Sequence, residues 1–173
     1  MDLIVTCARH FEDETKEEIA SILKEIGDAG PQIVITSFSG ILTVKTTLSH
    51  TDVIKKIREK LEDEPWTIRY TMRVIPMFDV VECNLDSIAD AAAAQSQKIK
   101  QDETYRITIE KRDSDISSAE IITRVADRIK NKVSLQKYDW VVLVETIGTI
   151  CGVSILKDDE VLSVERTKRG SME

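Results

Sequence analysis

The first 75 residues switch repeatedly between the apolar period of a strand and that of a helix, and this order limits the folds open to the chain. Residues 3–8, LIVTCA, form a short apolar run that favours a strand. Residues 12–26 follow with isoleucine and leucine at the spacing of an amphipathic helix. The chain therefore begins with a strand and then a helix.

A β-hairpin and a second helix come next. Residues 32–38 and 41–47 have strand patterns and flank Ser39-Gly40, which is typical of a two-residue hairpin turn. After the hairpin, either Ser49 or Thr51 can cap a helix whose apolar residues again form one stripe. The sequence thus predicts two strands followed by a second amphipathic helix.

Residues 66–75 return to alternation and complete the order β-α-β-β-α-β, which is the split βαβ arrangement of ferredoxin-like folds. Pro76 ends this closing strand or marks an edge, because proline cannot donate to a strand ladder. We therefore predict a ferredoxin-like domain over residues 1–78 and a second domain over residues 79–173.

The second half predicts another mixture of helices and strands. The expected elements are an alanine-rich helix over 86–100, a strand over 104–110, a helix over 118–131, strands over 139–146 and 150–156, and a short strand over 161–164. The run WVVLV is continuously apolar, which favours a central strand covered on both faces by helices. The fold class predicted for the whole chain is α/β, in its α+β form.

The charge of the chain is uneven along its length. The net charge is -7, but residues 1–103 hold 19 acidic and 12 basic side chains, whereas residues 104–173 hold 12 of each. An acidic chain of this kind does not coat nucleic acid nonspecifically. The neutral second part can still present a local basic face to a polyanion.

Three basic groups in the second part are candidates for binding phosphate, because clustered lysine and arginine neutralise a nucleic-acid backbone without reading its bases. The first is Lys111-Arg112 at the exit of a strand. It is followed by a helix start in which Ser117 and Glu120 have the spacing of a capping box. The other candidates are Arg124, Arg128 and Lys132 along one helix face, and Arg166, Lys168 and Arg169 near the C-terminus. An isolated basic helix face is more often only solvated, and that alternative stays open.

The residues also carry a family resemblance. The run TYRITIEKRDSDISSAEIITRVADRI, followed by VSLQKYDWVVLVETIGTICGVSIL, resembles a THUMP domain, in particular that of the tRNA acetylation adaptors. The matching features are the basic pair, the helix with EII, and the strand that ends in Glu145. The resemblance covers about residues 80–170, and it implies an N-terminal ferredoxin-like domain before the THUMP domain.

The resemblance implies that the chain binds the acceptor stem and 3′ end of tRNA. Because the chain ends at residue 173 without a fused catalytic domain, it resembles the members that stand alone. Those members present tRNA to a separate acetyltransferase, which makes N4-acetylcytidine. By this resemblance Lys111 and Arg112 are the best candidates for phosphate contact, with Arg169 next.

An enzyme site is not indicated. The chain has only two histidines, three scattered cysteines without disulfide or metal-ligand spacing, and no glycine pattern for phosphates, so we predict no catalytic residue, no metal and no cofactor. Asp139 and Glu145 flank the central strand, and we expect a structural role for both rather than acid–base catalysis. Tyr138, beside Lys137, is a candidate platform for an unpaired base.

The sequence also indicates a location for the protein and leaves two other functions open. The sequence shows neither a secretion signal nor an apolar run of about 20 residues, so we expect a cytoplasmic protein outside the membrane. The principal rival function is a small-molecule sensor or subunit-assembly module on a ferredoxin-like fold. A further rival is a tRNA-modifying enzyme in its own right.

Overall fold

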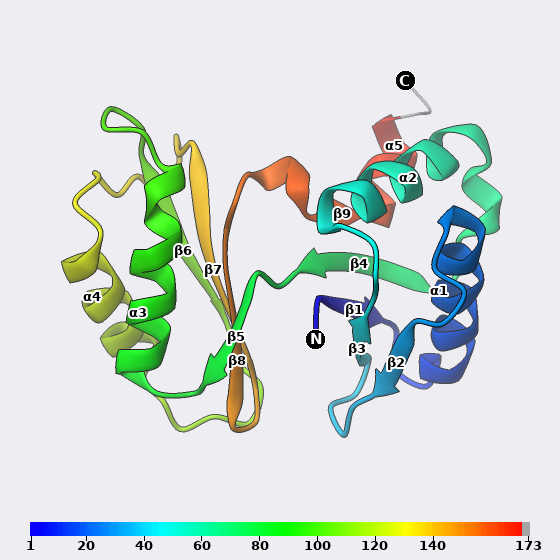
Figure 1. The fold of residues 1–173 in the computed structure, drawn as a ribbon, viewed down its shortest axis with the longest axis horizontal. Coiled ribbons are helices and arrows are strands. Elements are labelled where there is room, and N and C mark those ends of the chain that lie inside the picture. Colours follow the sequence, from blue (N-terminus) through cyan, green and yellow to red (C-terminus); the bar gives the residue numbers. More distant parts are fainter. Residues whose placement is uncertain (171–173) are drawn as a thin grey trace. The chain divides into compact units, whose positions relative to one another are not determined.

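The computed structural model describes residues 1–170, which form two compact units (Figure 1). The first unit comprises Met1–Pro76 together with the described residues from Asp159 onward, and the second comprises Met77–Asp158. The sequence-based boundary after residue 78 lies close to the one observed. The prediction for the C-terminal residues differs, because residues 159–170 belong to the first unit and not to the second.

The first unit has the expected order with two later additions. Its elements are β1 (Leu3–Cys7), α1 (Glu12–Ile26), β2 (Gln32–Ile35), β3 (Ile41–Lys45), α2 (His50–Asp63), the 3-10 turn η1 (Pro65–Thr67), β4 (Thr71–Pro76), β9 (Leu162–Ser163) and α5 (Val164–Gly170). The sheet order is β2-β3-β1-β4-β9, and every pairing is antiparallel. The first four strands have the order and directions of a ferredoxin-like sheet.

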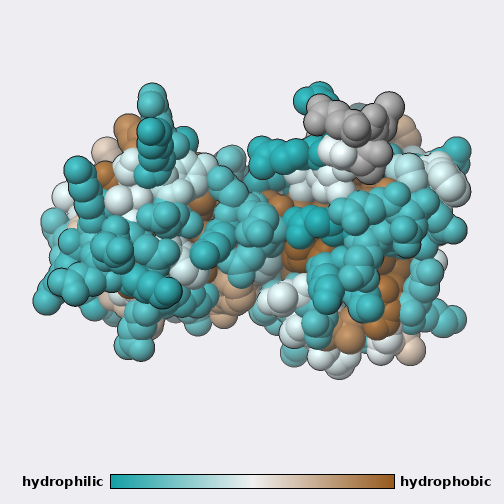
Figure 2. Space-filling model, turned by 90° about the horizontal axis from the view of Figure 1, so that it is seen from above, coloured by the Kyte–Doolittle hydropathy of each residue, from teal (hydrophilic) through white to brown (hydrophobic). Residues whose placement is uncertain are grey.

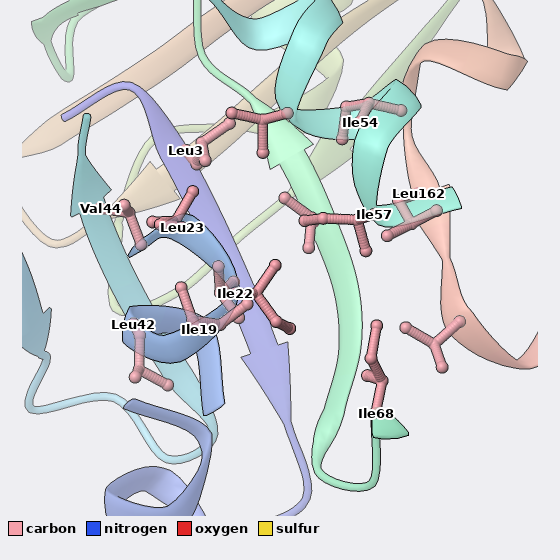
Figure 3. Packing of buried hydrophobic residues seen from close by; sticks show 14 of the residues in the cluster. Leu3, Ile19, Ile22, Leu23, Leu42, Val44, Ile54, Ile57, Ile68 and Leu162 are labelled. Carbon is pink, nitrogen blue, oxygen red and sulfur yellow. The ribbon is translucent and has the colours of Figure 1, made fainter. Parts of the chain in front are cut away.

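The core of the first unit lies between this sheet and the helices. Ile19, Ile22 and Leu23 of α1 pack in one cluster with strand residues such as Leu42 (Figure 3). The C-terminal segment joins the same cluster through Leu162, which is fully buried and pairs with Val74 of β4. Burial of this apolar side chain is the physical reason why the C-terminal residues leave the second unit.

The closing strand is shorter than its sequence pattern indicates. Residues 65–67 form η1, and β4 begins only at Thr71. The carboxylate of Glu18 holds the intervening segment, because it accepts hydrogen bonds from the amides of Arg69, Tyr70 and Thr71. A tertiary contact therefore overrides the alternation of residues 66–70.

The second unit has one four-stranded sheet. Its elements are β5 (Asp79–Glu82), α3 (Leu85–Gln95), the 3-10 turn η2 (Ser96–Lys98), β6 (Tyr105–Glu110), α4 (Ser118–Arg128), β7 (Trp140–Ile147) and β8 (Ile150–Leu156), with the turn η3 (Asp158–Glu160) at its boundary. The sheet order is β5-β8-β7-β6, in which β6 and β7 are parallel and the other pairs are antiparallel.

Both helices of the second unit lie on the same face of its sheet (Figure 1). Ile88 of α3 and Ile121 of α4 share one core cluster with Val142 and Val144 of β7. The prediction that helices cover both faces of this strand was therefore wrong. The strand is central within the sheet, as expected, but its alternate residues face away from α3 and α4.

Candidate nucleic-acid interface

Arg112 is engaged in a structural ion pair. Its guanidinium Nη1 lies 2.5 Å from Oε2 of Glu145, whose side chain is fully buried, and only 16% of the Arg112 side chain is exposed. The Arg112 amide also donates to Thr146 Oγ1, and its carbonyl accepts from the Gly148 amide. Arg112 therefore joins the ends of β6 and β7, which differs from the expected exposed phosphate contact. Its neighbour Lys111 is exposed, as predicted.

The two arginines of the predicted helical stripe pair with acids of the neighbouring helix. Arg124 contacts Asp86, and Arg128 Nη1 lies 2.6 Å from Asp90 Oδ1. The acids are four residues apart on α3 and the arginines are four apart on α4, so the two pairs repeat with the helical period. The stripe is thus close to neutral, because each positive charge faces a carboxylate.

The third member of the predicted stripe, Lys132, is not on the helix. The helix α4 ends at Arg128 rather than at residue 131, because Ile129 adopts an extended conformation. The chain then forms a bridge between Val133 and Tyr105. Lys132 is exposed in the loop that follows, and its carbonyl accepts from the Tyr105 amide.

The C-terminal basic group lies in the first unit, on α5. Arg169 pairs with Glu165, and Lys168 Nζ donates to the carbonyl of Ile68 at 2.7 Å. Arg166 is exposed, with no ion pair to the residues that the structure describes. The eight predicted residues are therefore divided between two units, and the side chains of five of them already have partners.

Charge is distributed differently over these units than along the sequence. The first unit, with residues 1–76 and 159–173, has 17 acidic and 13 basic residues, and the second has 14 acidic and 11 basic residues. Both units are therefore acidic. The apparent neutrality of the second part came from dividing the chain at residue 103, which lies inside the second unit.

Within the second unit, positive charge gathers at one end of the sheet. We call this region the basic loop end and define it as residues 98–106, 129–139 and 157–158. It contains seven basic and four acidic residues, a balance of +3, whereas the rest of the unit has a balance of -6. Lys111 and Arg112 lie outside the basic loop end, in the part of the unit whose charge balance is -6.

The parallel pairing of β6 and β7 creates the basic loop end, because it places the loops before both strands at the same edge of the sheet. The side-chain amide of Asn131 donates to the carbonyls of Lys100 and Glu103, and the Ser134 amide donates to the Tyr105 carbonyl. The carboxylate of Asp139 accepts from the Thr104 amide at 2.8 Å. Asp139 thereby joins the segment before β7 to the segment before β6.

The loop hydrogen bonds involve backbone groups and acids and leave lysine side chains exposed. Within the basic loop end, four exposed lysines have no ion pair to any residue from 1 to 170, namely Lys100, Lys130, Lys132 and Lys137. In contrast, the carboxylate of Glu103 accepts a hydrogen bond from the Lys100 amide within the loop. This hydrogen bond is the main reason why the pKa of the Glu103 carboxyl lies below the ordinary value of 4.5. Figure 2 views the molecule from above Figure 1, and the surface over this unit is mostly hydrophilic.

Aromatic side chains accompany these cations. The Arg106 guanidinium lies 5.9 Å from the centre of the Tyr138 ring, and Lys157 Nζ lies 5.0 Å from the centre of the Trp140 ring. Beside them, 67% of Leu135 is exposed. The combination of exposed lysine side chains with aromatic and apolar surface suits a nucleic-acid strand, which presents both phosphates and base faces.

Sequence reasoning named only Lys132 and Tyr138 of this end as candidate contacts. It noted Lys137 beside Tyr138, but it missed Lys100 and Lys130. The signal was available in RIKNKVSLQK, where four basic residues follow one another with no acid between them. Among residues 1–170, no group of three or more histidine, cysteine, aspartate or glutamate side chains is arranged to hold a metal ion. The described helices also include none with the length and apolar character of a membrane span.

Comparison with known proteins identifies the second unit. Residues 82–156 match the family model described as THUMP domain. The chain contains a THUMP domain. The match lies within the region for which the sequence predicted it, and it includes the basic loop end except for its last two residues.

Solved structures that contain the same fold cover both units. PH1313 from Pyrococcus horikoshii superposes with a TM-score of 0.67 at 18% identity, over 91% of this chain and 55% of that protein. TrmN from Thermus thermophilus has a TM-score of 0.57 at 11% identity, over 90% of this chain and 45% of that protein. A 4-thiouridine synthetase, solved in complex with RNA and bound ATP, has a TM-score of 0.54 at 11% identity. The match covers 91% of this chain and 42% of that protein.

A relative in sequence is the uncharacterized protein MJ0421 of Methanocaldococcus jannaschii. It is 28% identical over 179 residues, which cover 100% of this chain and 46% of the relative. The chain thus spans about half the length of the proteins that it matches. The solved structures superpose on both units, in agreement with the predicted fold class.

Proposed function

We propose that this chain binds tRNA and that the basic loop end of the THUMP domain makes the main contacts with phosphate. The observation that carries this proposal is the concentration of positive charge, +3 at one end of a domain whose net charge is -3. A local excess of this kind attracts a polyanion even when the whole protein is acidic. The RNA complex of the 4-thiouridine synthetase, which shares the fold, supports the choice of ligand.

The acceptor stem and the unpaired 3′ end are the proposed binding region. Lys100, Lys130, Lys132 and Lys137 would neutralise phosphates of the stem, and each contact would release counterions. The ring of Tyr138 and the guanidinium of Arg106 would contact an unpaired base. Lys111 and Arg166 remain proposed outer contacts because both are exposed.

The role proposed for the bound complex is that of a non-catalytic adaptor in the cytoplasm. It would present tRNA to a separate acetyltransferase that forms N4-acetylcytidine. The resemblance of residues 104–156 to the acetylation adaptors supports this part. Binding by electrostatics and shape would suit an adaptor, because it would position the RNA without chemistry at the THUMP domain.

The binding proposal is tested by titrating labelled mature tRNA with the full chain at several salt concentrations. We expect affinity to fall steeply between about 50 and 200 mM salt, because several phosphate contacts are broken. Removing the 3′ overhang from the tRNA should weaken binding further. Affinity that ignores both salt and the overhang would refute the proposed interface and favour the sensor or assembly function.

A charge-matched pair of variants locates the interface. The double substitution Lys132→Ala with Lys137→Ala should reduce the slope of log affinity against log salt by about 2, since each phosphate contact contributes about 1. The control, Lys24→Ala with Lys55→Ala, changes the net charge equally at exposed positions of the first unit. Equal effects of the two double variants would show only nonspecific attraction.

The adaptor role needs a separate measurement. Purified chain, tRNA and acetyl-coenzyme A are incubated with and without a cell extract depleted of this protein, and modified nucleosides are measured by mass spectrometry. We expect N4-acetylcytidine only when the chain and the extract are both present. Formation of a modified nucleoside by the chain alone would identify it as an enzyme.

A further inference from the structure

Two of the three cysteines touch each other within the THUMP domain. Cys83 directly follows β5 and Cys151 lies in β8, and the antiparallel pairing of these strands places Val81 opposite Cys151. The two Sγ atoms are 2.6 Å apart, and both residues are free thiols. An S–S bond is about 2.05 Å long, so the two sulfurs can form a bond after a small side-chain movement.

The surroundings of the two thiols differ. Cys151 is fully buried, and this burial, together with its contact with Cys83, raises the pKa of the Cys151 thiol above the ordinary value of 9.0. Cys83 is only partly buried, and its Sγ lies 3.5 Å from Ser114 Oγ. It also lines an open pocket with Asn84, Ser114 and Thr149. A small oxidant in solution can therefore reach Cys83 more readily than Cys151.

We propose that Cys83 and Cys151 form a peroxide-sensitive dithiol site, in which Cys83 is oxidised first and Cys151 then closes an intramolecular disulfide. The inference is independent of RNA binding, because both cysteines lie outside the basic loop end. It also goes beyond the spacing of the cysteines in the sequence, which showed no disulfide framework. The strand pairing brings together residues that are 68 positions apart.

The chemistry proceeds in two steps. The thiolate sulfur of Cys83 attacks one oxygen of hydrogen peroxide, the O–O bond breaks, and the leaving hydroxide takes up a proton to become water, while Cys83 becomes a sulfenic acid. The sulfur of Cys151 then attacks the sulfur of Cys83, the S–O bond breaks, and the hydroxyl leaves as water with the Cys151 proton. The two thiols lose two electrons and peroxide gains them. A dithiol reductant reverses the reaction by thiol–disulfide exchange.

The test uses the full chain in its folded state. The protein is treated with hydrogen peroxide, unfolded, alkylated with iodoacetamide, and analysed by intact mass and peptide mapping. We expect a monomer lighter than the reduced chain by two hydrogen atoms before alkylation, with residues 83 and 151 in one linked peptide pair. Cys7, which is buried in β1 of the first unit, should remain available for alkylation after unfolding. Dithiothreitol should restore three alkylated cysteines.

Single substitutions assign the order of the steps. Cys151→Ser should leave a Cys83 sulfenic acid that dimedone traps, whereas Cys83→Ser should react at least tenfold more slowly with peroxide. The control Cys7→Ser should form the disulfide at the wild-type rate. Over-oxidation of Cys83 without a disulfide, a bond that includes Cys7, or bonds between chains on a nonreducing gel would each overturn the proposal. The wild-type peptide map remains decisive even where a variant folds poorly.

Discussion

The Arg112 guanidinium and the buried Glu145 carboxylate form an ion pair that connects the ends of β6 and β7. Replacing Arg112 by alanine would leave the carboxylate without this cation, which costs on the order of 3 kcal/mol in the free energy of unfolding. We expect urea unfolding of Arg112→Ala to show that loss, and Glu145→Gln in the same chain to recover part of it. Lys111→Ala is the neighbouring control and should change stability by less than about 0.5 kcal/mol. A loss of RNA affinity by folded Arg112→Ala at wild-type stability would contradict the structural role.

The ion pairs between α3 and α4 lead to a prediction about both stability and binding. Arg124→Ala with Arg128→Ala should cost no more than about 1 kcal/mol per pair, because all four side chains are exposed. The double variant should also weaken tRNA binding less than the Lys132 and Lys137 double variant, since Asp86 and Asp90 already balance the arginines. Stronger binding by Asp86→Asn would instead indicate that freed arginine charge reaches the RNA.

The turn before β3 requires glycine at residue 40. Gly40 has a φ of +73°, and a Cβ there would lie 2.5 Å from the carbonyl oxygen of Cys7. Gly40→Ala should therefore lower the free energy of unfolding by at least about 2 kcal/mol. Gly30→Ala is the matched control, because no heavy atom beyond its two chain neighbours lies within 4 Å of the added methyl carbon. Thermal unfolding followed by circular dichroism measures both, and similar melting temperatures for the two variants would disagree with this geometry.

A buried carboxylate makes the first unit sensitive to acid. Asp28 accepts hydrogen bonds from the Thr46 hydroxyl at 2.6 Å and from the amides of Thr47 and Gly30. The Thr46 hydrogen bond is the largest cause of the lowering of the Asp28 pKa below its ordinary value of 3.8. A lowered folded-state pKa stabilises the protein above the unfolded value, and this stability is lost as the pH falls through the folded value.

Replacing Asp28 by asparagine should remove this pH-dependent stabilisation. The variant should be less stable than the wild type at neutral pH, and the difference should shrink as the pH falls below 3.8. Urea midpoints measured from neutral to strongly acidic pH test this. Asp63→Asn removes the same charge at an exposed position of α2 and should follow the wild-type profile. A constant difference at every pH would exclude titration of Asp28 as the cause.

Local sequence signals predicted the starts of α2 and α4, because the groups that cap a helix are only three residues apart. Ser49 was one of two candidate caps, and its hydroxyl accepts from the Asp52 amide. Ser117 accepts from the Glu120 amide, as the capping box predicts. The end of α4 was less predictable, because Ile129 is extended and the chain after it forms a bridge to the distant Tyr105.

The candidate interface was less visible in the sequence, because the availability of a cation depends on its partners in three dimensions. Arg112 and Arg124 looked like free cations, but their carboxylate partners are 33 and 38 residues away. Conversely, Lys100 and Lys137 belong to separate loops that meet only because β6 and β7 run parallel. Position along the chain could not report either relationship.

The sequence by itself determined the order of the elements in the first 75 residues, the apolar stripes of the helices and the resemblance to a THUMP domain, because these depend on periodicity and short spacings. The tertiary structure decided that the C-terminal segment joins the first sheet, that five predicted cations already have partners, and that Cys83 meets Cys151. Each of these depends on strand order and helix packing, which bring together residues far apart in the chain.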